Sequence, residues 1–96
     1  MANLTILAKI EAKPGQSEFV KQEVLKLVTP SRQDEGCIEY RLQADNNNDG
    51  LFVMFEVWQS SEMLKKHMET EHFQAFVKNT EGKIEPLVVN EMTELA

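Results

Sequence analysis

Apolar and polar residues alternate at the beginning of the chain, over residues 4–12. The apolar positions of this segment are Leu4, Ile6, Ala8, Ile10 and Ala12. A period of two places these side chains on one face of an extended segment, so the pattern predicts a strand. Pro14-Gly15 follows as a turn signal that ends the strand.

The next segment has helical spacing. We expect a helix to begin near Ser17, which can cap it, and to end at Thr29, because Pro30 disfavours helical geometry in the residue before it. The apolar positions between these limits form one stripe of an amphipathic helix: Val20, Val24, Leu27 and Val28.

The middle of the chain predicts a hairpin and a second helix. Two apolar segments, residues 37–44 and 51–58, flank an Asn- and Asp-rich run that ends in Gly50, which is a dense turn signal. Ser60 and Ser61 then begin a helix that is expected to pause near Thr70-Glu71, resume, and end at Gly82. Residues 87–93 predict a fourth strand.

The predicted order is therefore strand, helix, strand, strand, helix, strand, within a single domain over residues 1–96. This order predicts an α+β, ferredoxin-like βαββαβ fold, in which a four-stranded antiparallel sheet carries both helices on one face. A chain of 96 residues is long enough for one domain and too short for two.

The third strand is apolar on both of its faces, although the predicted helices cover only one face of the sheet. One face carries Leu51, Val53, Phe55 and Val57, and the other carries Phe52, Met54 and Trp58. A strand that is apolar on both sides is expected to be buried on both sides. We therefore predict that a second copy of the chain packs on the open face, forming a homodimer.

Composition narrows the classes of partner. The formal net charge is −6, which argues against nucleic acid or an anionic membrane as a partner. The single cysteine, Cys37, allows no intrachain disulfide, and no apolar run approaches the length of a membrane span. The expected localisation is cytoplasmic.

Glu56 and Trp58 are the first candidates for chemistry. They are two positions apart on a strand, so they share a face, roughly 6.6 Å apart along it. Glu56 is the one charge on that face, and such a carboxylate is either paired or has a raised pKa. It is a proton acceptor or an anchor for a substrate hydroxyl, or it forms a salt bridge with Arg41 or with a residue across the dimer.

His67 and His72 are the two histidines of the chain. Five positions correspond to about 140° around a continuous helix, so the two imidazoles are not expected to share a face. With one cysteine and no obvious third ligand, we expect no metal site. Each histidine is either a packed core residue or a base, since imidazole is the side chain best suited to proton transfer near neutral pH.

Aromatic side chains supply the rest of a candidate pocket. Tyr40 and Trp58 each join an apolar body to a polar hydrogen, which suits an aromatic, oxygen-bearing ligand but also suits a core. Phe73 and Phe76 are expected mainly in the core, with Phe73 and Arg41 retained as candidate substrate contacts.

These residues resemble the antibiotic biosynthesis monooxygenase family, and within it the small quinol monooxygenase-like proteins. The matching segments are Lys13-Pro14-Gly15, Glu35-Gly36-Cys37 with Tyr40, Glu56-Val57-Trp58 with Ser60, His67, and His72-Phe73. They occur in the expected order over nearly the whole chain.

The resemblance implies a dimeric α+β barrel and cofactor-independent oxidation of a small quinol or phenolic substrate by dioxygen. In such chemistry the protein deprotonates the substrate, and the electron-rich anion reacts with dioxygen directly. The implied base is His67 or His72, with Glu56 orienting one of them, and Trp58 and Tyr40 hold the substrate oxygen.

Other branches of the family suggest alternatives. The haem-degrading members need a histidine, an asparagine and a tryptophan at positions that correspond here to Val77, Ala8 and His67, so no haem is expected. A second branch isomerises or degrades a phosphorylated autoinducer-2 compound, for which Arg41 or Lys65-Lys66 would supply the basic groups. A non-catalytic dimeric protein that binds a small ligand is the third reading.

Overall fold

The computed structural model describes residues 3–96 and confirms the predicted order of elements. The second helix is divided in two. The elements are β1 (Leu4–Glu11), α1 (Ser17–Arg32), β2 (Cys37–Asp45), β3 (Asn48–Trp58), α2 (Ser61–Met68), α3 (Glu71–Thr80) and β4 (Val88–Met92).

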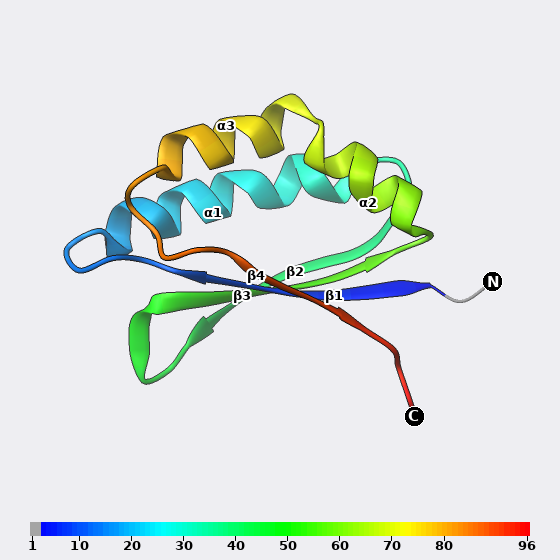
Figure 1. The fold of residues 1–96 in the computed structure, drawn as a ribbon, viewed down its shortest axis with the longest axis horizontal. Helices are drawn as coiled ribbons and strands as arrows, with labels where there is room; N and C mark the ends of the chain where they lie inside the picture. The colour runs from blue at the N-terminus through cyan, green and yellow to red at the C-terminus, as the bar shows by residue number, and fades with distance from the viewer. Residues whose placement is uncertain (1–2) are drawn as a thin grey trace.

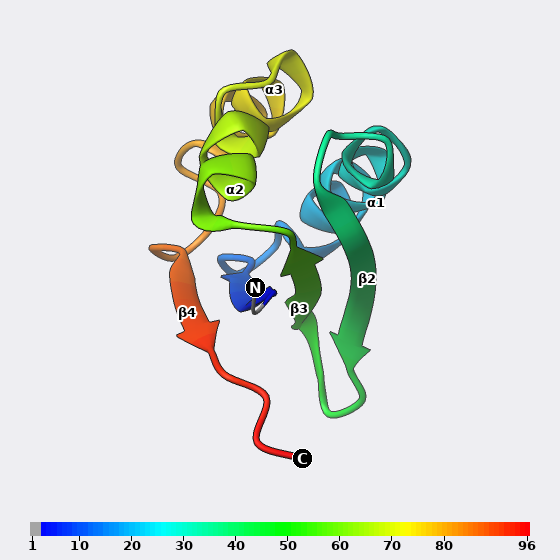
Figure 2. The ribbon, with the colours of Figure 1, turned by 90° about the vertical axis from the view of Figure 1, so that its right-hand side faces the viewer.

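The four strands form one antiparallel sheet in the order β2-β3-β1-β4. All three helices cover one face of this sheet, and the other face carries no helix (Figures 1 and 2). The α+β ferredoxin-like fold is therefore confirmed. None of the helices in residues 3–96 combines the length and apolar character that a membrane crossing requires.

The core lies between the sheet and the helices. Alternate residues of the central strands point to the helices, so Ile6 and Ile10 of β1 meet Phe52, Met54 and Trp58 of β3. The stripe on α1 packs against them, and its members Val20, Val24 and Leu27 are buried as the spacing predicts. Alternation on β3 consequently places Glu56 inside, in a row of apolar side chains.

Two predicted boundaries are wrong. Helix α1 does not end at Thr29 but includes Pro30 and runs to Arg32. Proline in the final turn removes a single N–H, and its carbonyl still accepts a bond from Gln33, so the turn closes. The hairpin turn is also shorter than its composition suggests, because β3 already begins at Asn48.

Candidate functional site

Strand β3 provides the floor of the site. Trp58 Nε1 donates a hydrogen bond of 2.8 Å to Glu56 Oε1, and both side chains are buried. The salt bridge considered between Glu56 and Arg41 is wrong. Arg41 lies opposite Phe55 in the sheet and therefore points to the helix-free face, where its Nη1 is 3.4 Å from Glu39 Oε1.

Burial raises the pKa values of two side chains in the floor of the site, Glu56 and Tyr40. It raises the pKa of Glu56 to about 7, and the hydrogen bond from Trp58 opposes part of this rise. Tyr40 lies opposite Glu56 on β2, and burial raises the pKa of its hydroxyl, with a further rise from the neighbouring carboxylate. Glu56 is thus poised to exchange a proton near neutral pH, and Tyr40 remains a neutral hydroxyl.

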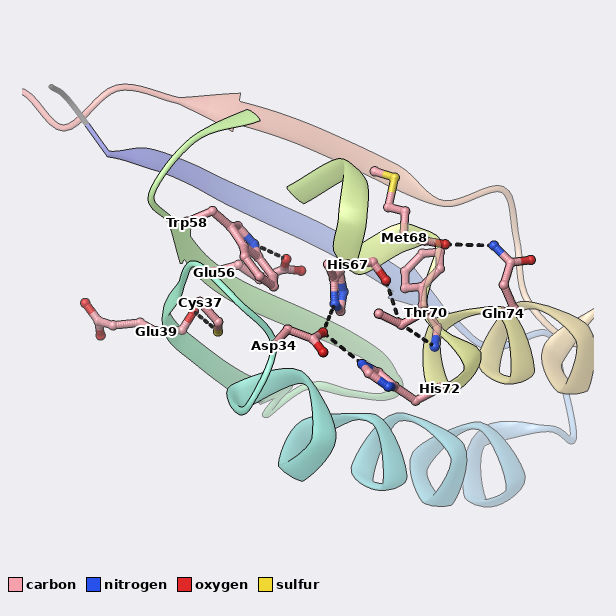
Figure 3. A network of polar contacts seen from close by, with 11 residues as sticks. Asp34, Cys37, Glu39, Glu56, Trp58, His67, Met68, Thr70, His72 and Gln74 are labelled. Carbon is pink, nitrogen blue, oxygen red and sulfur yellow. Dashed lines mark hydrogen bonds and ion pairs between the residues drawn. The ribbon is translucent and has the colours of Figure 1, made fainter. Parts of the chain in front are cut away.

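The interruption between α2 and α3 brings the two histidines together. Helix α2 ends at Met68, and Thr70 caps α3, so residues 67 and 72 lie on different helices. Both imidazoles reach the same carboxylate oxygen: His67 Nδ1 is 2.7 Å and His72 Nε2 is 2.8 Å from Asp34 Oδ2 (Figure 3). The expectation that the histidines diverge is therefore wrong, because it assumed one continuous helix.

Asp34 is the functional candidate that the sequence analysis missed. It stands in the loop between α1 and β2, far from both histidines along the chain. Its signal in the sequence is weak: an acidic residue two positions before Gly36, whose φ of 81° turns the chain into β2. Only the tertiary fold places that loop beside the end of α2.

His67 is surrounded by aromatic rings. Its ring centroid lies 4.7 Å from that of Trp58, 5.1 Å from Phe73 and 5.5 Å from Tyr40. Burial lowers the pKa of His67 and His72 lowers it further, while Asp34 opposes the change. At neutral pH the ring is consequently an uncharged imidazole. Its Nε2 is buried without a hydrogen-bond partner among the described residues.

A cavity of about 40 Å³ lies between the sheet and the helices. Its wall is almost entirely apolar, and the polar side chains in it are Tyr40, Glu56 and His67. Phe73 and Met68 border it from the helix side. Trp58 is hydrogen-bonded to Glu56, while His72 borders a separate groove between α1 and α3. Of the predicted site residues, Tyr40, Glu56, His67 and Phe73 line this cavity, whereas Trp58, His72 and Arg41 do not.

The cluster of Asp34, His67 and His72 also bears on metal binding. One ligand atom from each lies within 4.8 Å of the others, so the three side chains could together ligate a divalent cation. In the structure, however, both nitrogens point at a single oxygen at hydrogen-bond distance, which satisfies them without an ion.

The chain matches known proteins over most of its length. The family described as antibiotic biosynthesis monooxygenase matches residues 3–79. "Putative monooxygenase YcnE" of Bacillus subtilis is 38% identical over 77% of this chain and 78% of that protein. "Probable quinol monooxygenase YgiN" of Escherichia coli is 30% identical over 84% and 88%. A Synechocystis relative is longer, and the match spans 52% of its length at 31% identity.

A solved structure agrees with the fold in detail. PA3566 from Pseudomonas aeruginosa superposes with a TM-score of 0.95 at 35% sequence identity, covering 100% of this chain and 97% of that one. The family match, the relatives from Bacillus subtilis and Escherichia coli and this superposition agree, and this chain belongs to the antibiotic biosynthesis monooxygenase family.

Proposed function

We propose that this protein is a cofactor-independent monooxygenase that oxidises a small quinol or phenolic aromatic substrate with dioxygen. The observation that carries the proposal is the pairing of two proton acceptors, Glu56 and His67, in the wall of one apolar cavity. Tyr40 adds a hydroxyl that can donate to a substrate oxygen. The family, together with the relative described as a probable quinol monooxygenase, supports the choice of substrate class.

The reaction balances without a further reductant. A quinol loses its hydroxyl protons to the cavity acceptors, and the resulting anion gives electrons to dioxygen. One oxygen atom forms a bond to a ring carbon, which loses its hydrogen, and the other oxygen leaves as water, so that quinol and O₂ become hydroxyquinone and H₂O. The apolar wall keeps bulk water from the anion, and the donors stabilise charge on its oxygen.

The cavity must enlarge to admit such a substrate. A volume of 40 Å³ holds a few water molecules and is too small for an aromatic ring. Met68 and Phe73 border the cavity and are only half-buried, and a methionine side chain rearranges easily. We propose that the cavity opens when the side chains of Met68 and Phe73 move.

Oxygen uptake with reduced naphthoquinol tests the proposal. We expect one O₂ consumed per hydroxyquinone formed, without hydrogen peroxide, and a rise in kcat/KM through about pH 7 as Glu56 loses its proton. His67→Ala and Glu56→Gln should each lower kcat about 10²-fold or more. Oxidation to the plain quinone with release of peroxide, unchanged in both variants, would show uncatalysed autoxidation and refute the proposal.

The phosphorylated-signal alternative has no support in the site. Arg41 points away from the cavity, and Lys65 and Lys66 are exposed on α2, with Lys66 Nζ 3.4 Å from Glu35 Oε1. The cavity wall is apolar, and phosphate needs several donors or cations.

We also infer that the protein works as a homodimer through the helix-free face of the sheet. Leu7, Val53 and Phe55 form its apolar centre, and on β4 Val88 and Met92 are 48% and 44% exposed. A second copy would cover these side chains and close the two sheets into the barrel that the family resemblance implies.

A further inference from the structure

The hydrogen bonds of Asp34 determine which nitrogen of each histidine ring carries a hydrogen. Its Oδ2 lies 2.7 Å from His67 Nδ1 and 2.8 Å from His72 Nε2, and its side chain is only 13% exposed. An ionised carboxylate can accept hydrogen bonds but cannot donate them. Each imidazole must therefore present an N–H to Asp34 through the nitrogen that faces it.

This requirement determines the tautomer of His67. In a neutral imidazole one nitrogen carries the hydrogen and the other carries a lone pair. If Nδ1 donates to Asp34, Nε2 is the unprotonated nitrogen, and Nε2 is the buried atom of His67 that lacks a partner among residues 3–96. Because His67 lines the cavity, a free lone pair is available beside the place where a substrate would bind.

We propose that Asp34 is a positioning residue, which holds His67 as the Nδ1–H tautomer so that Nε2 accepts the proton of the substrate hydroxyl. This inference rests on the proposed function. In the step, the substrate O–H bond breaks, an Nε2–H bond forms, and the electron pair stays on the substrate oxygen. The imidazolium that results keeps its Nδ1–H on the carboxylate, whose negative charge stabilises it.

His72 restrains the other side of the carboxylate. Its ring donates through Nε2, and in the neutral ring this tautomer is opposite to that of His67. It is 24% exposed and borders the groove between α1 and α3. The packing of Trp58 and Phe73 around His67 prevents its ring from rotating away. Asp34 bridges the buried imidazole of His67 and the partly exposed imidazole of His72.

The tautomers can be measured without any substrate. Nitrogen-15 NMR of the labelled protein at pH 8 distinguishes the two nitrogens of each ring, and His72→Gln assigns the remaining signals to His67. We expect the Nδ1–H form for His67 and the Nε2–H form for His72. An Nε2–H form for His67 would overturn the proposal. A stoichiometric change of both rings on addition of Zn²⁺ would also overturn it, because the cluster would then be a cation site.

Turnover then tests the role of Asp34 against a neighbour in the same loop. Asp34→Asn should shift His67 towards the Nε2–H form and lower kcat at least about 10-fold with little change in KM. Asp34→Glu, which keeps the acceptor, should restore part of kcat. Glu35→Gln is the matched control, since Glu35 is exposed and pairs with Lys66 at the surface, and it should change neither quantity.

The outcomes separate this proposal from the proposed function. If His67→Ala lowers kcat and Asp34→Asn leaves it unchanged, Asp34 is not a positioning residue although the enzyme is a monooxygenase. If the wild-type protein oxidises no quinol, the proposed function fails, and the His67 tautomer alone decides whether Asp34 fixes that ring. If Asp34→Asn does not fold, the kcat of Asp34→Glu and the tautomers of the wild-type protein still test whether Asp34 positions His67.

Discussion

At the scale of single residues, Glu56 is a carboxyl group that the fold removes almost completely from water. It is buried in a row of apolar residues and accepts a hydrogen bond from Trp58. Its pKa of about 7 lies well above the ordinary 4.5, so the folded protein binds this proton more tightly than the unfolded chain does. The stability that the protonated carboxyl contributes is complete below pH 4.5 and is lost as the pH rises through 7.

The change Glu56→Gln tests this directly, because glutamine is neutral at every pH. Between pH 4.5 and 8 we expect the free energy of unfolding of wild type to fall relative to the variant by up to about 3 kcal/mol. Urea denaturation of both proteins at the two pH values measures the difference. Parallel pH profiles would show that Glu56 is not perturbed by burial.

Trp58 contributes the hydrogen bond that moderates this pKa. In Trp58→Phe the carboxylate loses its donor at 2.8 Å, so the pKa of Glu56 should rise further. The rising limb of kcat/KM should move to higher pH, and the free energy of unfolding should fall by roughly 1–3 kcal/mol from the lost bond and packing. A limb that stays in place in Trp58→Phe would assign the titration to another group.

At this scale the sequence correctly predicts that Glu56 and Trp58 share a face of β3, because side chains two positions apart on a strand point the same way. Sequence reasoning failed for Asp34 and Arg41. Asp34 gains its role from a contact between segments more than thirty positions apart, which no local pattern encodes. The adjacency of the two strands predicts a salt bridge between Arg41 and Glu56, but alternation along β2 places Arg41 on the helix-free face.

At the scale of elements, the break between α2 and α3 makes the histidine cluster possible. Thr70 stabilises this break from both sides: its Oγ1 donates to the carbonyl of His67 at 2.6 Å and accepts from the amide of Phe73 at 3.3 Å. The sequence predicted the pause at Thr70 correctly. The angle of about 140° between the histidines applies only to a continuous helix, so the break at Thr70 brings His67 and His72 together against that expectation.

Removing this cap should loosen α3. We expect Thr70→Ala to lower the free energy of unfolding by about 1 kcal/mol and Thr70→Ser, which keeps the hydroxyl, to lower it by much less. Thermal denaturation measures both variants. Because His72 lies in the first turn of α3, the alanine variant should also weaken its bond to Asp34, which would be visible in the His72 nitrogen shifts. Equal effects of the two substitutions would contradict the capping role.

The turn before β2 gives a second test at this scale. Gly36 and Gly15 both have a positive φ, of 81° and 82°, so alanine is strained at either position. A methyl group at Gly36 would overlap Cβ and Cγ of Met63 on α2, whereas at Gly15 no atom of residues 3–96 beyond its chain neighbours lies within 4 Å of it. We expect Gly36→Ala to cost roughly 1–3 kcal/mol more than Gly15→Ala in urea denaturation. Equal costs would show that α2 moves aside freely.

At the scale of the whole molecule, the sheet has one covered face and one open face. The apolar residues on both sides of β3 predict that both faces of the sheet are covered, but they do not identify what covers the helix-free face. The helix-free face has an apolar centre with charged residues such as Lys9, Glu39 and Arg41 around it. That distribution is typical of an interface with a dry centre and a polar rim.

A single charge at the centre of this face should separate the subunits of the proposed dimer. Phe55 lies in the middle of the open face, where an aspartate would be buried without a partner on association, so Phe55→Asp should be monomeric. Leu25→Asp is the matched control, because Leu25 is 46% exposed on α1 and should leave association unchanged. Light scattering at micromolar concentration reads the mass of both. A monomeric wild-type protein would refute the dimer, and the open face would then need another partner.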